Sequence, residues 1–147
     1  MQKHFLYSFA KRLKRISKLE VVLVEEEEII KGSKIYLLAN STQLKQTGSD
    51  ILLQKSHQES FYHPDIDLLF LSAAQLQNVA IKAYLLSGIG SDGAKGLLAL
   101  KAQGAYTIVQ DEASSIVYGM PKSAYVMDAH CKVLSIDAIV ADIKEEL

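Results

Sequence analysis

The sequence has few of the features that mark secreted, membrane or nucleic-acid-binding proteins. It contains a single cysteine, Cys131, so no internal disulfide can form, which fits a reducing compartment. Its 16 basic and 17 acidic residues give a formal charge of -1, too small to draw in nucleic acid or an anionic membrane. Its apolar runs are far shorter than a membrane span, and no signal peptide is visible. We therefore expect a cytoplasmic protein without nucleic-acid binding or membrane insertion.

Length and composition favour one globular domain over residues 1–147. Hydrophobic residues make up 49% of the chain and charged residues 22%, which is ordinary for a protein with a buried core. No internal repeat or low-complexity linker divides the sequence. A single α/β unit is the expected organisation.

Apolar patterning predicts strands that alternate with helices. The first helix should turn Phe5, Phe9, Leu13 and Ile16 inward and a basic face outward, most simply into solvent and alternatively toward an acidic partner. Further helices are expected at 67–76 (capped by Asp65), from 94 to near Gly104, at 119–124, and after Ser135. Strands are expected at 20–24, 35–39, 51–53, 84–86, 105–109 and 132–134, with an acidic loop at 25–28 and turn-forming residues at 40–50. The predicted fold is a doubly wound, mostly parallel sheet with an antiparallel hairpin, flanked by helices in a Rossmann-like, three-layer arrangement.

The most informative stretch is the turn between the strand at 84–86 and the helix from 94. It contains Gly88, Gly90 and Gly93 and a single charge, Asp92. The spacing matches a dinucleotide-binding fingerprint, with Asp111 about twenty residues later at the end of the next strand. Against that function, the Asp92 carboxylate would face a pyrophosphate at the helix N-terminus, where amides or cations belong. A tight turn without chemistry is a further alternative.

Other candidate sites are weak, and we expect neither a cofactor nor a metal. His57 and His63 lack a third ligand nearby, and the adjacent carboxylates at 25–28 lack the alternating spacing of a metal cage. His130 and Cys131 are neighbours in an extended segment, so their side chains should point to opposite faces.

The glycine turn and its surroundings resemble the bacterial chemotaxis protein-glutamate methylesterases (CheB). The resemblance rests on Gly88-Ile-Gly-Ser-Asp-Gly-Ala94, on 96–108 with its Gly104-Ala-x-Thr-Ile108 end, on Gln110-Asp-Glu-Ala-Ser-Ser115 and on Val117-Tyr-Gly-Met-Pro121. Upstream, Ser8-Phe-Ala-x-Arg-Leu13, residues 27–36 and Pro64-x-Ile-Asp-Leu-Leu-Phe70 occur in the family's order. The similarity therefore covers essentially the whole chain.

The resemblance implies a Ser-His-Asp hydrolase that cleaves glutamyl methyl esters on methyl-accepting chemotaxis receptors and deamidates receptor glutamines. The family's triad aspartate corresponds to Asp92, which would hold the histidine in the right tautomer. The family's oxyanion-binding amide corresponds to Ile89, where many members have Met. Asp65 stands where the family usually has Ser, and Asp128 where it commonly has Gly.

The family's nucleophilic Ser and catalytic His have no counterparts in this sequence. Met1 aligns with the residue directly after that His, and the receiver domain of many members is also missing. We therefore expect an N-terminally truncated, C-terminal portion of the catalytic domain that is inactive alone. Missing sheet strands would favour an oligomer, a swapped assembly or a fold completed by a partner. A non-catalytic receptor-binding module is the alternative to an enzyme.

Overall fold

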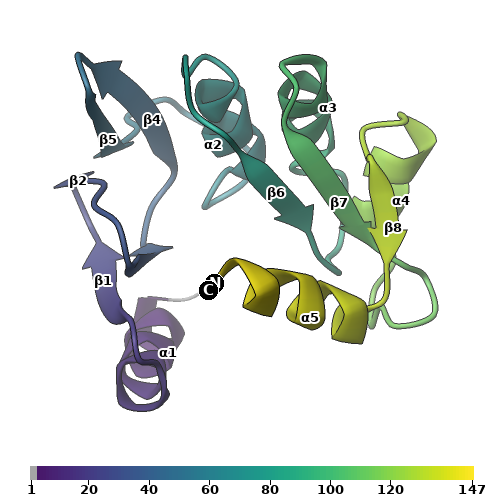
Figure 1. Cartoon of the computed structure of the whole chain (residues 1–147), viewed down its shortest axis with the longest axis horizontal. Coiled ribbons are helices and arrows are strands. Elements are labelled where there is room, and N and C mark those ends of the chain that lie inside the picture. The colour runs from purple at the N-terminus through teal and green to yellow at the C-terminus, as the bar shows by residue number, and fades with distance from the viewer. Residues whose placement is uncertain (1–2) are drawn as a thin grey trace.

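The computed structural model describes residues 3–147, which form three sheets and five helices (Figure 1). The helices are α1 (Lys3–Ile16), α2 (Ile66–Ala73), α3 (Ala94–Ala102), α4 (Met120–Val126) and α5 (Ile136–Glu146). The strands are β1 (Glu20–Val24), β2 (Glu27–Ile29), β3 (Lys34–Leu38), β4 (Thr42–Thr47), β5 (Asp50–Lys55), β6 (Lys82–Leu85), β7 (Tyr106–Gln110) and β8 (Lys132–Leu134).

The C-terminal half is a parallel sheet in the order β6-β7-β8, with helices between successive strands. The central strand β7 buries four consecutive residues, as expected for a parallel strand covered on both faces. Ile108 and Val109 of β7 and Leu97 of α3 have no exposed surface. The main hydrophobic cluster of the molecule is centred on these elements.

The N-terminal half holds a second, smaller parallel sheet made of β1 and β3. Helix α1 packs on β1 and buries only Leu6 and Ala10. The prediction that Phe5, Phe9 and Ile16 turn inward is therefore wrong, because β1 covers a neighbouring strip of the helix and leaves these three exposed. Leu13 is half-buried.

A third sheet, antiparallel and in the order β2-β5-β4, adjoins α2 through β4. Two local predictions are corrected here. Glu27 and Glu28 belong to β2 rather than to an acidic loop, because their backbones pair with β5. Residues 42–47 form β4 rather than turns, and the hairpin reverses around Gly48, whose φ is 61°.

The predicted three-layer α/β fold is confirmed: the parallel strands lie between helices, and the hairpin forms its own antiparallel sheet with β2. Predicted caps are also found. The side chain of Asp65 accepts a hydrogen bond from the Leu68 amide at the start of α2, and that of Ser135 accepts one from the Ala138 amide at the start of α5. Across residues 3–147 there is no helix with the length and apolarity to cross a membrane.

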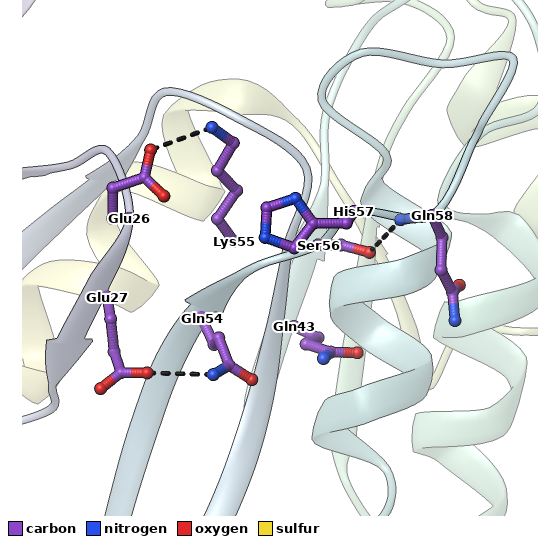
Figure 2. A pocket seen from close by; sticks show the side chains of 8 residues that line it. All are labelled: Glu26, Glu27, Gln43, Gln54, Lys55, Ser56, His57 and Gln58. Atoms are coloured by element: carbon purple, nitrogen blue, oxygen red, sulfur yellow. Dashed lines mark hydrogen bonds and ion pairs between the residues drawn. The ribbon is translucent and has the colours of Figure 1, made fainter.

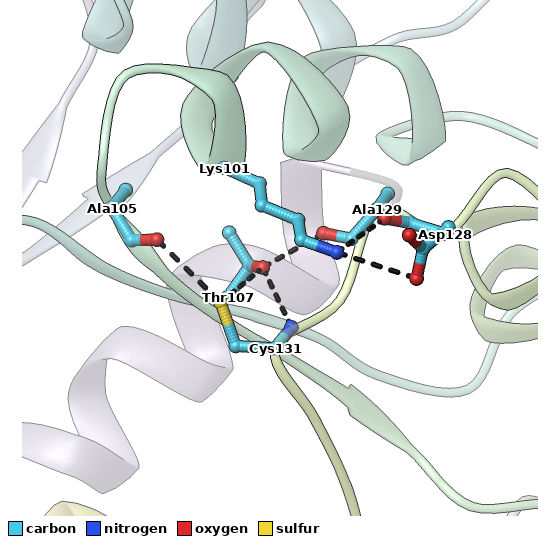
Figure 3. Close-up of polar contacts among 6 residues, drawn as sticks. All are labelled: Lys101, Ala105, Thr107, Asp128, Ala129 and Cys131. Atoms are coloured by element: carbon cyan, nitrogen blue, oxygen red, sulfur yellow. Dashed lines mark hydrogen bonds and ion pairs between the residues drawn. The ribbon is translucent and has the colours of Figure 1, made fainter.

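The joint between α3, β7 and β8 explains one departure from the family pattern (Figure 3). Asp128 has a φ of 55°, a left-handed conformation in which glycine is most at ease and aspartate is tolerated. The Lys101 ammonium donates a hydrogen bond to the Asp128 carbonyl oxygen at 2.7 Å and lies 3.3 Å from its carboxylate. Nearby, the Thr107 hydroxyl donates to the Ala129 carbonyl at 2.7 Å. Asp128 is thus held in place by α3.

Candidate functional site

The glycine turn follows β6 at the carboxyl end of the parallel sheet, where ligands and catalytic groups usually lie in such folds. Gly90 and Gly93 have φ values of 91° and 89°, so the turn needs glycine at both positions. At Gly93 a Cβ would also lie 2.7 Å from a Leu85 methyl group and 2.9 Å from an Ile66 methyl group. The turn is therefore tightly packed against the strand before it and against α2.

A second loop, between β7 and α4, fixes the other side of the turn. The Gly88 amide donates to the Val117 carbonyl at 3.0 Å, and the Met120 amide donates to the Gly88 carbonyl at 2.9 Å. A Cβ at Gly119 would lie 2.6 Å from the Gly88 carbonyl oxygen, a contact that excludes any larger residue without movement. The glycine at position 88 thus allows the two loops to pack closely together.

Asp92 is buried, with 4% of its surface exposed, and both of its carboxylate oxygens are engaged by α2. One oxygen accepts from the Ile66 amide and the other from the Asp67 amide, each at 2.9 Å. These are the first two amides of the helix, which have no partner inside it and carry its positive end. The N-terminus of α2 therefore fixes both the position and the orientation of this carboxylate.

Asp67, in α2, makes the reciprocal hydrogen bond to the start of α3. Its carboxylate accepts a hydrogen bond from the Gly96 amide at 2.7 Å. Gly96 allows the approach, since a Cβ there would lie 2.5 Å from the Cβ of Phe70. Burial raises the pKa of Asp67, and the nearby Asp92 carboxylate adds to that rise against the lowering effect of the Gly96 amide. Helices α2 and α3 thus exchange capping carboxylates at their N-termini.

The Ile89 amide, implied as an oxyanion donor, lies in the turn between Gly88 and Gly90. Within the part of the chain that the structure describes, no acceptor takes its hydrogen. The Ile89 side chain is 82% exposed. A backbone amide without an acceptor is able to donate to a developing oxyanion.

None of the four histidines hydrogen-bonds to Asp92 among residues 3–147. His130 stacks on Tyr125 with ring centroids 4.9 Å apart, and its Nδ1 is buried without a partner. His4 lies in α1, and His57 and His63 lie in the loop before α2. The Cys131 side chain contacts Thr107. Hydrogen bonds from the amide and the hydroxyl of Thr107 lower the pKa of the Cys131 thiol.

A wide cavity of about 770 Å³ lies beside the antiparallel sheet rather than at Asp92 (Figure 2). Its wall groups largely satisfy one another: Lys55 pairs with Glu26 at 2.9 Å, and Gln54 donates to Glu27 at 3.0 Å. His57 also lines it. Residues 3–147 contain no group of three or more histidine, cysteine or acidic side chains placed to hold a metal.

Asp111, the acidic residue of the dinucleotide pattern, is engaged locally. It accepts hydrogen bonds from the Ser114 amide at 2.9 Å and from the Ser114 hydroxyl at 2.5 Å, and these bonds lower its pKa. Asp92 accepts hydrogen bonds from two backbone amides of α2. Both oxygens of Asp92 are thus committed to α2 rather than to a ligand at the start of α3.

Sequence reasoning did not identify Asp67 and the α2 N-terminus as the supports of Asp92. The signal was present in Pro64-x-Ile-Asp67, which the resemblance included as a motif without assigning it a role. Twenty-four residues separate Asp67 from Asp92, so only the packing of α2 against α3 reveals the contact.

Comparison with known proteins gives one consistent result. The CheB methylesterase family model matches residues 1–143. A protein-glutamate methylesterase/protein-glutamine glutaminase from Photorhabdus laumondii is 38% identical over 90% of this chain and 39% of that protein. One from Carboxydothermus hydrogenoformans is 35% identical over 95% of this chain and 43% of that protein.

A solved structure agrees with the sequence relatives. The Thermotoga maritima CheB methylesterase catalytic domain superimposes with a TM-score of 0.86 at 29% identity, covering all of this chain and 80% of that domain. The chain spans about two fifths of the length of the curated relatives it matches. On the family match, the relatives and the shared fold, this chain belongs to the CheB methylesterase family.

Proposed function

We propose that this chain supplies the aspartate of a Ser-His-Asp hydrolase that cleaves glutamyl methyl esters and glutaminyl amides of chemotaxis receptors in the cytoplasm. The observation that carries the proposal is the buried Asp92 carboxylate, fixed by two α2 amides at the carboxyl end of β6. Each carboxylate oxygen has a second lone pair available. Asp92 can therefore also accept a hydrogen bond from an imidazole N–H, which sets the tautomer of that imidazole and stabilises its protonated form.

In this mechanism the remaining groups have defined tasks. A serine hydroxyl attacks the ester or amide carbonyl while the imidazole takes its proton, and the Ile89 amide stabilises the oxyanion that forms. The imidazole then protonates the departing methanol or ammonia, and water hydrolyses the acyl-enzyme. Asp92 orients the base throughout.

We propose that residues 1–147 act as one unit of the catalytic domain. The serine and the histidine have to come from a segment outside these residues. The 147-residue chain alone is expected to be inactive. Assaying methanol release from a methylated receptor fragment with the purified chain tests this directly. Hydrolysis that disappears in Asp92→Asn would show that a nucleophile and base exist within the chain.

We further propose that the open edge of β6 is completed by additional strands. The Tyr106 amide donates to the Ile81 carbonyl at 3.0 Å, so by alternation the backbones of residues 82 and 84 point away from β7. No other strand among residues 3–147 pairs with that side of β6. A separate segment or a second copy is expected to cover it, and sedimentation would show an oligomer in the second case. A monodisperse, stable monomer would count against both.

A further inference from the structure

Three strongly exposed apolar side chains surround the glycine turn on three different loops. Ile89 lies in the turn itself, Phe61 in the loop before α2 and Ile116 in the loop between β7 and α4. Phe61 is 92% exposed and Ile116 is 95% exposed. Large apolar side chains exposed to this degree, gathered beside a candidate site, suggest a surface that contacts a partner.

Contacts between backbone and side chains bring the three loops together. The Gly88 amide bonds the Val117 carbonyl, which places Ile116 and Ile89 on adjoining segments. The Tyr62 hydroxyl lies 3.5 Å from where a Cβ on Gly90 would be, which brings the Phe61 loop up to the turn as well. The rings of Phe61 and Tyr62 meet edge to face at 5.2 Å.

The loops that present these side chains are internally braced. The Ser60 hydroxyl donates to the Asp65 carboxylate and accepts from the Tyr62 amide. In the other loop, the Gln110 side-chain amide donates to the Ser114 carbonyl at 2.8 Å, and the Ser115 hydroxyl donates to the Asp111 carbonyl at 2.6 Å. A braced loop loses little further freedom when a partner binds.

The charges beside these side chains favour a protein over an anionic lipid surface. Glu59 precedes Phe61 by two residues, and Asp111 and Glu112 share the loop that carries Ile116. The Ser114 hydrogen bonds hold the pKa of Asp111 low, so its carboxylate stays charged. Carboxylates at this rim would repel anionic lipid headgroups and suit a neutral or basic apolar partner.

We propose that Phe61, Ile89 and Ile116 form the docking surface for the protein segment that carries the target glutamyl ester or glutaminyl amide. This inference rests on the proposed function, because it places the substrate side chain beside Asp92. The reacting group is small, so most of the binding energy has to come from residues that flank it. Those residues would be apolar, with neutral or basic neighbours.

A binding measurement tests the surface without requiring turnover. The probe is a receptor cytoplasmic fragment with glutamine at its methylation positions, titrated into the ¹⁵N-labelled 147-residue chain. Phe61→Ser and Ile116→Ser are each expected to weaken binding about fivefold or more, as truncation of interface anchors does. Leu147→Ser is the matched control, since Leu147 is also 82% exposed but lies at the end of α5.

The outcomes separate this inference from the proposed function. Asp92→Asn is expected to bind the fragment as the parent chain does, since it alters the orienting carboxylate and leaves the three apolar side chains in place. Equal weakening by Leu147→Ser, unchanged binding by both loop variants, or no binding to the parent chain would overturn the docking surface. Self-association that the loop variants abolish would assign the surface to a second copy and overturn it too. None of these results bears on the role of Asp92.

Discussion

The two parallel sheets of this molecule are built from similar sequence patterns but are buried very differently. Around β7, the inward-facing side chains are fully covered, and Leu97, Ile108 and Val109 have no exposed surface. Around β1, α1 buries two residues and leaves a strip of Phe5, Phe9 and Ile16 open. The core beneath Asp92 is therefore closed around β7 although the β6 edge is open, whereas α1 leaves apolar side chains uncovered on its helix face.

The largest expected effect is a difference in the free energy of unfolding between variants of the two halves. Leu97→Ala opens a cavity in the closed core and is expected to lower the free energy of unfolding by about 2–5 kcal/mol. Ile16→Ala on the open strip of α1 should change it by no more than about 0.5 kcal/mol. Urea denaturation of both variants measures this. Similar losses would mean that the α1 strip is covered in solution.

Helix packing beneath the site gives the next test. Gly96→Ala places a Cβ 2.5 Å from the Cβ of Phe70 and 3.0 Å from the Asp67 carbonyl oxygen. It should lower the free energy of unfolding by about 1–3 kcal/mol, the usual cost of overpacking. Gly32→Ala is the control, because nothing lies within 4 Å of its Cβ. Equal stability of the two variants would contradict the close α2–α3 contact.

Removing the Asp92 carboxylate tests how it is held. Asp92→Ala leaves the Ile66 and Asp67 amides buried without acceptors, at an expected cost of about 1–3 kcal/mol in the free energy of unfolding. Glu112→Ala removes an exposed carboxylate from a nearby loop and should be close to neutral. Hydrogen exchange should quicken at the Ile66 and Asp67 amides in the first variant alone. Unchanged protection there would mean that α2 does not hold Asp92.

The smallest effect is a pH dependence of opposite sign to the usual one for carboxylates. Folding raises the pKa of Asp67 above its ordinary value of 3.8. Between pH 3.8 and the pKa of the folded state, the folded protein therefore binds more protons than the unfolded protein. This group's contribution to stability is therefore fully present below pH 3.8 and is lost as pH rises through that window. Asp67→Asn should become more stable relative to the parent chain across the same rise. A flat difference in unfolding free energy from pH 3 to 7 would contradict the burial of Asp67.

Local pattern was sufficient to predict most elements of the C-terminal half. Three features depend only on residues close together in the sequence: the glycine turn at 88–93, the Asp65 cap and the Pro121 helix start. The structure contains all three features. The inward face of α1 was mispredicted because periodicity shows that a helix has an apolar side without showing how much of it a neighbour covers. β4 was missed because its residues, 42–47, are polar apart from Leu44, and only its pairing with β5 makes it a strand.

The candidate site shows the same limit. Asp92 could be singled out from its turn and from the family resemblance. Its support by α2 could not, since it depends on backbone amides and on a helix crossing made possible by Gly96. Nor could the exposure of Phe61 and Ile116 be predicted, because these belong to loops whose side-chain directions follow from tertiary contacts.

Turnover in a complete catalytic domain would show whether Asp92 orients the base of a hydrolase. In a chimera, this chain would replace its matched segment in the Thermotoga maritima CheB methylesterase catalytic domain, and methanol release from a methylated receptor fragment would be followed. We expect turnover to fall by about 10⁴-fold in Asp92→Asn, as removal of a triad carboxylate does elsewhere. An Asp92→Asn chimera that turns over as fast as its parent would show that Asp92 does not orient the base.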